Sequence, residues 1–205
     1  MKRIVSIQDI SDLGKCSLTA ALPVISALGV ECAVMPTAVL STHTMFKGFT
    51  FHDLTDEMEP DARHWKEQGI KFDAVYTGYL GSYRQIEIVK QFFADFGEGA
   101  KIIVDPAMAD NGKLYTGFTP EFALKMAELC EGADIVLPNI TEACFLTDFD
   151  KTCNQGISCV CSILIFCHKN FIALCHTDDN CWRNLRENHI SALTALHTKS
   201  FIMRS

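Results

Sequence analysis

The first 150 residues alternate short β-rich runs with helical patterns, and this rhythm is the strongest constraint on the fold. Strands are predicted over residues 3–7, 32–40, 49–54, 72–77, 101–104 and 134–137, and helices over residues 15–28, 53–68, 82–96, 119–130 and from 141 onward. Strands that alternate with helices pair in parallel through crossover connections. The sequence therefore predicts an α/β fold, with a mostly parallel sheet that helices cover on both faces.

Three residues are expected to shape the helix ends. Thr119 is predicted to cap the helix that follows it, with Pro120 in the first turn. Thr141 is predicted to cap the last helix. Pro23 lies inside the pattern over residues 15–28, where it should either kink the helix or mark a late start.

Composition places the chain among globular proteins. It has 205 residues and a mass of 22.8 kDa, with 48% hydrophobic and 21% charged residues, which excludes chain-wide disorder. The longest apolar run, over residues 159–167, is about half the ~20 residues of a membrane-spanning helix. Asp9 follows the start too closely for a signal peptide. The net charge of −7 and pI of about 5.4 argue against a nucleic-acid partner.

Polar side chains follow the predicted strands, at the ends where parallel sheets bind ligands. Asp105 and Asp110 come after a buried-type strand, and such carboxylates can hold a divalent cation or shape a phosphate site. The same segment can equally be a plain turn, because Asp-Pro and Asn-Gly are turn formers. Asn139 and Glu142 come after the next strand, where an ordinary capped helix would also favour Glu142. Both alternatives stay open from these residues alone.

Three further segments have weaker signals. Residues 77–81 (Thr-Gly-Tyr-Leu-Gly) can let a ligand approach the backbone or can form a tight turn, and the turn is favoured. Residues 41–44 (Ser-Thr-His-Thr) can contact a small polar ligand or form a plain loop. Residues 14–16 (Gly-Lys-Cys) do not form a Walker-type phosphate loop, because the spacing Gly-x-x-x-x-Gly-Lys-Ser/Thr is absent.

Five of these motifs stand in one order. They are Ser-Ile-Gln-Asp at 6–9, Ser-Thr-His-Thr at 41–44, Thr-Gly-Tyr at 77–79, Val-Asp-Pro with a second Asp at 104–110, and Pro-Asn-Ile-Thr-Glu-Ala at 138–143. In this order and spacing, the chain resembles the pyridoxal (pyridoxine, pyridoxamine) kinases of the ribokinase-like superfamily over roughly residues 1–148. The resemblance implies a ribokinase-like layered fold, incomplete at its C-terminus. It also implies transfer of the ATP γ-phosphate to the 5′-hydroxyl of a B6 vitamer.

The resemblance also implies a substrate pocket. Thr44 and Tyr79 match positions that line the pyridine pocket. Asp9 falls where the family usually has a substrate-contacting serine, and this departure puts its contact with the ring in question. The B6 vitamer is the expected small-molecule partner, and the family further implies a homodimer in the cytoplasm.

A second set of matches concerns ATP and metal. Asp105, Asp110 and Asn139 match residues near the ATP phosphates, while Asp105 and Glu142 match the residues that support Mg²⁺, the latter through water. This pattern suits the cation, since Mg²⁺ prefers one or two carboxylates together with waters and substrate phosphates. ATP and Mg²⁺ are therefore the expected cofactors, and the need for a monovalent cation stays open.

One family element is missing from the sequence. Members of the family have a late Gly-Thr-Gly-Asp, whose glycine amides stabilise the transferred phosphoryl group and whose Asp takes the proton of the substrate hydroxyl. No glycine follows Gly156, and the late aspartates Asp178 and Asp179 have no glycine beside them. No catalytic base is identifiable, so this chain is expected to be impaired as a kinase.

Residues 151–205 differ from the rest of the chain. Residues 1–150 have a net charge of −10, whereas the last 55 residues have a net charge of +3 and hold six of the ten cysteines. Three interpretations remain open for this Cys-rich tail: a zinc or redox module, a variant lobe that buries its cysteines, or a sequence foreign to the family through a frame change, intron read-through or alternative end. The abrupt loss of Gly and Pro favours the third. Paired zinc ligands are lacking beyond Cys159 and Cys161.

Three alternatives to an active pyridoxal kinase follow. A hydroxymethylpyrimidine kinase shares the superfamily fold and the phosphate chemistry. A non-catalytic vitamin-binding protein or dimerisation partner would keep the substrate half of the fold without the nucleotide half. Finally, a chain that lacks a sheet edge can fail to fold stably and aggregate.

Overall fold

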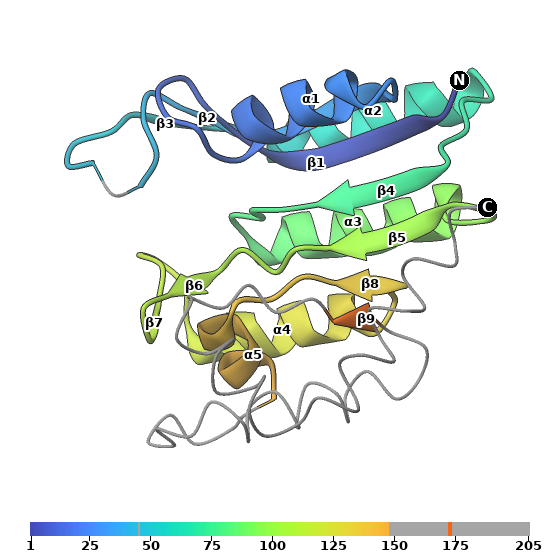
Figure 1. Cartoon of the computed structure of the whole chain (residues 1–205). Helices are drawn as coiled ribbons and strands as arrows, with labels where there is room; N and C mark the ends of the chain where they lie inside the picture. Colours follow the sequence, from blue (N-terminus) through green and yellow to red (C-terminus); the bar gives the residue numbers. More distant parts are fainter. Residues whose placement is uncertain (45, 148–171, 174–205) are drawn as a thin grey trace.

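The computed structural model describes residues 1–44, 46–147 and 172–173, and its centre is a seven-stranded sheet (Figure 1). The strand order is β3-β2-β1-β4-β5-β8-β9. The strands are β1 (Arg3–Ser11), β2 (Glu31–Leu40), β3 (Phe51–Asp53), β4 (Ala74–Thr77), β5 (Lys101–Val104), β8 (Ile135–Val136) and β9 (Ile172–Ala173). Only β3 pairs antiparallel in this sheet as described. The predicted mostly parallel sheet is confirmed.

The direction of each crossover decides which face a helix covers. The helices are α1 (Leu18–Ala27), α2 (Thr55–Glu67), α3 (Tyr83–Phe96), α4 (Pro120–Cys130) and α5 (Ile140–Leu146). From β1 the chain steps through α1 to β2 on one side, and then returns past β1 to β4, β5 and β8. Crossovers between parallel strands are right-handed, so the direction of the crossover decides the face on which its helix lies. The crossover to β2 runs opposite to those that lead to β4, β5 and β8, and α1 therefore lies on one face while α2, α3 and α4 lie on the other (Figure 1).

The core lies between the sheet and the layer of α2, α3 and α4. Four aromatic side chains meet there: Phe92 packs 4.3 Å from Phe96 and 6.0 Å from Phe72 between ring centroids, and Trp65 adds an edge contact 5.6 Å from Phe72. Phe92 is 1% exposed. Full burial of one such ring contributes about 1.5–3 kcal/mol, so this cluster fixes the helices against the strands.

The helix starts differ in part from the sequence predictions. Thr119 caps α4 as expected, through a hydrogen bond from Phe122 N–H. The late start at Pro23 is wrong, because α1 already begins at Leu18 and Pro23 lies inside it on the exposed side. Water can there satisfy the carbonyl that proline leaves without an N–H donor. Thr141 as the cap of the last helix is also wrong, since α5 is capped by Asn139.

A hairpin follows β5 where the sequence had suggested a turn. Its strands, β6 (Ala109–Asp110) and β7 (Lys113–Leu114), pair antiparallel outside the main sheet. Asn111 adopts φ 50° and Gly112 φ 76°, the left-handed region that such a two-residue turn requires. The hairpin therefore holds Asp110 above the carboxyl edge of the sheet.

The predicted boundary at residue 150 falls outside the described residues, as do all six tail cysteines and the alternatives attached to them. Ile172–Ala173 is the described part of this region and extends the sheet by pairing parallel with β8. Among the helices that the structure describes, none is long and apolar enough to cross a membrane.

Candidate active site

The chain reverses its direction across the sheet at β1, and a crevice opens there. β1 leads to β2 on one side, while β4 lies on the other side of β1. In open α/β sheets, ligands bind beyond the carboxyl ends of the strands at such a switch point. Asp9 lies near the carboxyl end of β1 and Tyr79 follows β4. Topology alone therefore directs attention to these two side chains.

A cavity of about 520 Å³ lies at this point, under the β6–β7 hairpin; we call it the hairpin cavity. Four of the residues predicted for substrate and phosphate contact line it together: Asp9, Thr44, Tyr79 and Asp110. They come from β1, the segment after β2, the loop after β4, and the hairpin. Residues far apart in the chain thus meet around one space that is large enough for a small organic ligand.

The charge of Asp9 acts on the phenol of Tyr79. Asp9 is 5% exposed, and its burial raises the pKa of its carboxyl, while hydrogen bonds from Ser17 and Ser11 oppose that rise. Burial also raises the pKa of the Tyr79 phenol, and the charge of Asp9 adds to the effect. The Tyr79 ring stacks on Phe118 with centroids 5.5 Å apart. The phenol therefore stays neutral and can donate a hydrogen bond to a ligand.

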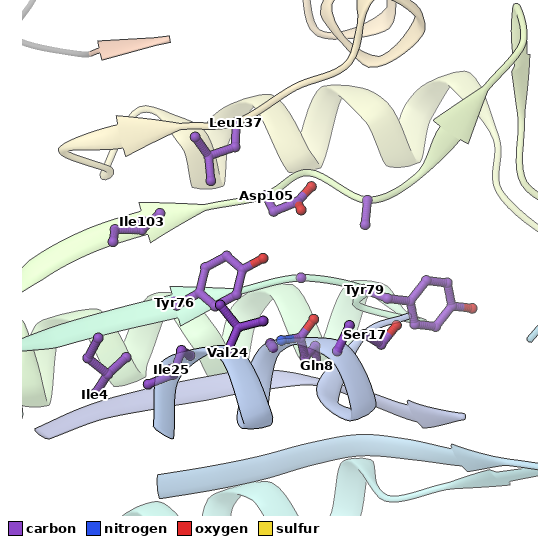
Figure 2. Close-up of a pocket in the computed structure, with 14 residues that line it drawn as sticks. Ile4, Gln8, Ser17, Val24, Ile25, Tyr76, Tyr79, Ile103, Asp105 and Leu137 are labelled. Carbon is purple, nitrogen blue, oxygen red and sulfur yellow. The ribbon is translucent and has the colours of Figure 1, made fainter. Parts of the chain in front are cut away.

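A second cavity of about 540 Å³, the α1 cavity, lies between α1 and the sheet (Figure 2). Asp105 lines it together with Tyr76 and Tyr79, and Tyr79 borders both cavities. Burial, together with the charge of Asp105 and the hydrogen bond that the Tyr76 hydroxyl donates to it, raises the pKa of Tyr76 to about 12. Tyr76 therefore remains a hydrogen-bond donor to the Asp105 carboxylate.

Asn139 and Glu142 line neither cavity. They form a reciprocal capping box at the start of α5, which accounts for both residue types without a ligand. They also reach the segment before the hairpin, because Met108 N–H donates to Glu142 Oε1 at 3.2 Å and Asn139 Nδ2 donates to Ala109 O at 2.8 Å. Their position therefore supports the chain that leads to Asp110.

The pKa of Glu142 is strongly shifted. Its side chain is buried at 3% exposure. Burial and the charge of Asp105 together raise its pKa to about 8, although N–H donors from Asn139, Met108 and Ala109 oppose the rise. A carboxyl whose pKa is raised by burial, with a second carboxylate adding to the rise, is the kind of group found at functional sites.

Sequence reasoning missed several lining residues. Lys15, Lys113 and Tyr115 border the hairpin cavity, and so does His43 of the run over residues 41–44 that the sequence had singled out. Lys15 belongs to the Gly-Lys-Cys segment at residues 14–16, which lacks the Walker spacing, and no other feature of the sequence marks Lys15 as a ligand contact. Lys113 follows the turn at Asn111, and nothing local marks it. Two lysines beside Asp9 and Asp110 give the cavity charges of both signs, which suits a ligand with phosphate or zwitterionic groups.

The sequence profile of the phosphomethylpyrimidine kinase family matches residues 16–170. This chain belongs to the phosphomethylpyrimidine kinase family. The match reaches some way past the boundary expected at residue 150. The resemblance to the pyridoxal kinases of the ribokinase-like superfamily, inferred from the five motifs, is confirmed, and so is the ribokinase-like fold.

Three known proteins show how similar this chain is to its relatives. A Bacteroides thetaiotaomicron protein, assigned as a phosphomethylpyrimidine kinase and crystallised with pyridoxal, is 40% identical with a TM-score of 0.78, over 84% of this chain and 62% of that one. The thiamine biosynthetic bifunctional enzyme TH1 of Arabidopsis thaliana is 32% identical over 67% of this chain and 26% of that enzyme. Pyridoxal kinase PdxY of Histophilus somni is 30% identical over 69% of this chain and 52% of that kinase. The chain thus spans about half or less of the curated relatives.

Proposed function

We propose that the hairpin cavity binds a B6 vitamer and that the fold is that of an ATP-dependent kinase acting on the vitamer's 5′-hydroxyl. The observation that carries this proposal is the meeting of Asp9, Thr44, Tyr79 and Asp110 around one cavity at the switch point. The motifs that suggested these residues are separated by tens of positions. The pyridoxal in the 40% identical Bacteroides structure supports the same ligand.

In this proposal each side chain has a physical role. The Tyr79 phenol, kept neutral by its raised pKa, donates a hydrogen bond to the pyridine ring or its substituents. Thr44, exposed at the cavity mouth, adds a hydroxyl. Asp9, in place of the family's usual serine, accepts rather than donates, and therefore favours a ligand that presents a protonated nitrogen or a hydroxyl.

Asp105, Asp110 and Asn139 would face the ATP phosphates, and Asp105 with Glu142 would hold Mg²⁺. Both carboxylate oxygens of Glu142 already accept backbone N–H bonds, so Glu142 would support the cation through water. Burial and the charge of Asp105 raise the pKa of Glu142, and a bound divalent cation would relieve the repulsion between the two carboxylates. Two carboxylates completed by waters and phosphates suit Mg²⁺. Bound there, Mg²⁺ would neutralise charge on the transferring phosphate.

We further propose that the 205-residue chain is a poor kinase. It lacks the late Gly-Thr-Gly-Asp, since no glycine follows Gly156. A positioned general base contributes about 10²–10⁴-fold to rate, and a lost anion-hole donor costs about 10²–10³-fold. Binding of the vitamer depends on other residues and is expected to survive.

The test is a calorimetric titration of the full chain with pyridoxal, followed by a phosphorylation assay with Mg-ATP. Tyr79→Ala should weaken pyridoxal binding at least tenfold. Tyr83→Ala serves as the control, because Tyr83 is 47% exposed and lines neither cavity. Absence of pyridoxal binding by the unmodified chain contradicts the vitamer site. Turnover at ordinary enzyme rates, about 1–10³ per second, contradicts the proposed impairment.

A hydroxymethylpyrimidine is the second candidate substrate. The family profile and the similarity to the thiamine biosynthetic enzyme TH1 favour it, and the same cavity would hold either ring. Titrating pyridoxal and hydroxymethylpyrimidine side by side separates the two, since the preferred ligand should bind at least tenfold more tightly.

If the chain binds pyridoxal but not ATP, the result favours a non-catalytic role in the cytoplasm, as a vitamer-binding protein or a homodimer partner. The titration with pyridoxal is therefore repeated with ATP and Mg²⁺. Sedimentation of the same sample tests the homodimer directly.

A further inference from the structure

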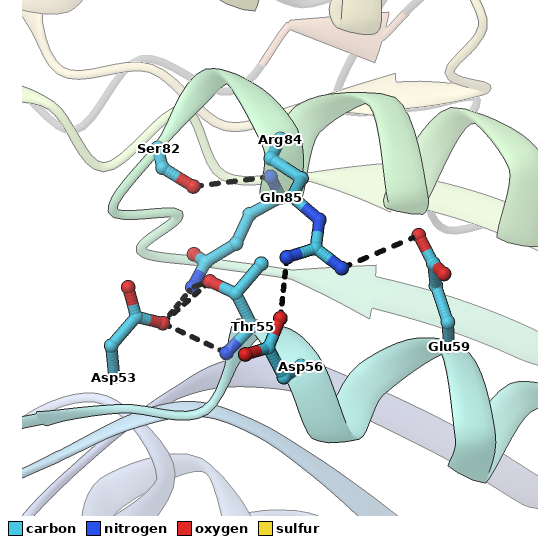
Figure 3. Close-up of polar contacts among 7 residues, drawn as sticks. All are labelled: Asp53, Thr55, Asp56, Glu59, Ser82, Arg84 and Gln85. Carbon is cyan, nitrogen blue, oxygen red and sulfur yellow. Dashed lines mark hydrogen bonds and ion pairs between the residues drawn. The ribbon is translucent and has the colours of Figure 1, made fainter.

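Gln85 is a buried polar side chain that none of the predicted motifs includes. It lies in the first turn of α3 at 1% exposure. Its Nε2 donates to Thr55 Oγ1 at 2.8 Å and lies 3.4 Å from Asp53 Oδ1 (Figure 3). The same Nε2 donates to Thr37 O at 3.0 Å. Its Oε1 accepts from Gly81 N–H at 2.6 Å. Both ends of the amide are therefore satisfied by fixed groups.

These bonds converge on the loop that carries Tyr79. Thr37 Oγ1 donates to the Tyr79 carbonyl at 3.0 Å, and Gln85 takes the N–H of Gly81 two residues later. Leu80, between them, is fully buried. The backbone on either side of Leu80 is thus held by two side chains, those of Thr37 and Gln85. The two residues are also linked to each other, because the Gln85 amide donates to the carbonyl of Thr37.

A third contact fixes the start of this loop. Gly78 N–H donates to Ile7 O at 3.0 Å, and a Cβ at Gly78 would lie 2.5 Å from Gln8 Oε1. The loop therefore lies against β1 with no room for a side chain at that point. With both backbone flanks held, the freedom left to Tyr79 is in its side-chain torsions, and its ring stacks on Phe118.

We propose that Gln85 and Thr37 form a clamp that sets the position of the Tyr79 ring in the hairpin cavity, and that Gln85 is a positioning residue for ligand binding. This inference rests on the proposed function, because Tyr79 is the side chain through which the clamp reaches the ligand. Gln85 itself touches no ligand; it acts through Gly81 and Thr37.

The test uses the full chain with two clamp variants and one control. Gln85→Met keeps the side-chain volume and removes all of its hydrogen bonds. Thr37→Val is milder and removes only the bond to the Tyr79 carbonyl, so it serves if Gln85→Met fails to fold. Arg84→Gln is the control: Arg84 is the neighbouring helix residue and pairs with Asp56 on the surface, away from the loop (Figure 3).

Two readouts separate positioning from mere stability. In Gln85→Met, NMR hydrogen exchange of the Gly81 amide should accelerate, while the Gly78 amide, bonded to Ile7 O, stays protected. Pyridoxal binding should weaken about three- to tenfold in each clamp variant and stay unchanged in Arg84→Gln.

Unchanged Gly81 exchange in Gln85→Met overturns the clamp, and so does faster exchange with unaltered pyridoxal affinity in both clamp variants. If Gln85→Met does not fold, unaltered affinity in Thr37→Val overturns it. If the unmodified chain binds no pyridoxal, the proposed function fails and the ligand role of Gln85 fails with it, while Gly81 exchange still decides the clamp.

Discussion

Asn139 and Glu142 cap each other at the start of α5. The Asn139 N–H donates to Glu142 Oε2 at 2.8 Å, and the Glu142 N–H donates to Asn139 Oδ1 at 2.9 Å. Glu142 also accepts from Met108 N–H, and its burial raises its pKa to about 8. One carboxyl thus serves the helix start, the segment before the hairpin and the electrostatics near Asp105.

The raised pKa of Glu142 makes the stability of the fold depend on pH. Its pKa is 4.5 in the unfolded chain and about 8 in the folded one, so the folded state binds the proton more tightly. The contribution of Glu142 to the free energy of unfolding is complete below pH 4.5 and is lost as pH rises to about 8. Over this range the free energy of unfolding falls by up to about 1.4 kcal/mol per pH unit. Glu142→Gln should flatten this slope in urea unfolding between pH 5 and 8. The exposed Glu131→Gln should keep it, and an equal slope in Glu142→Gln would refute the assignment.

Asn139→Ala should destabilise the fold by about 1–2 kcal/mol, because it removes the cap to Glu142 N–H and the bond from Nδ2 to Ala109 O. Thr141→Ala should cost less, since Thr141 Oγ1 only accepts from the exposed Gly112 N–H. Asn139→Asp keeps the cap and should fall between them. Urea midpoints of the three variants give the order, and a larger loss in Thr141→Ala would contradict the capping assignment.

The sequence predicted the strands well, but it predicted the wrong N-cap residue for α5. The strand over residues 101–104 was predicted with its observed bounds, Lys101–Val104, because a strand is a local pattern of apolar and β-branched residues. Asn139 and Thr141 are both good N-cap residues, so residue type alone did not choose between them. The spacing of Asn139 and Glu142, three residues apart, resembles a capping box and was the signal that could have decided it.

Features that depend on distant contacts could not be predicted. Gln85 occurs in a helical pattern where polar residues usually face water, and its burial depends on Thr37 and Thr55 from other elements. Lys113 enters the hairpin cavity only because β6 and β7 pair. The motif residues were found because each follows a strand predicted from the sequence, and strand order brings the carboxyl ends of the strands together.

Asp9→Asn should stabilise the fold at neutral and alkaline pH. Burial raises the pKa of Asp9 above 3.8, so its contribution to stability is lost as pH rises past that value. Asparagine stays neutral and can still accept the hydrogen bond from Ser11. Each kcal/mol gained raises Tm by about 2–4 °C in a domain of this size. Melts at pH 8 test this against the exposed Asp12→Asn, and a lower Tm for Asp9→Asn would be the contrary result.

Whether the chain folds as one cooperative unit depends on the aromatic cluster under α3. Phe92 lies 4.3 Å from Phe96 and 6.3 Å from Trp65 between ring centroids, at 1% exposure. Phe92→Ala should therefore cost about 3–5 kcal/mol, which is a large part of the 5–15 kcal/mol typical of a domain. Leu124→Ala, on the exposed side of α4 at 54% exposure, should change little. Urea unfolding should be a single transition whose midpoint moves in Phe92→Ala alone. A broad transition in the unmodified chain, insensitive to Phe92→Ala, would mean that this core does not form, and the proposed vitamer site would then lose its support.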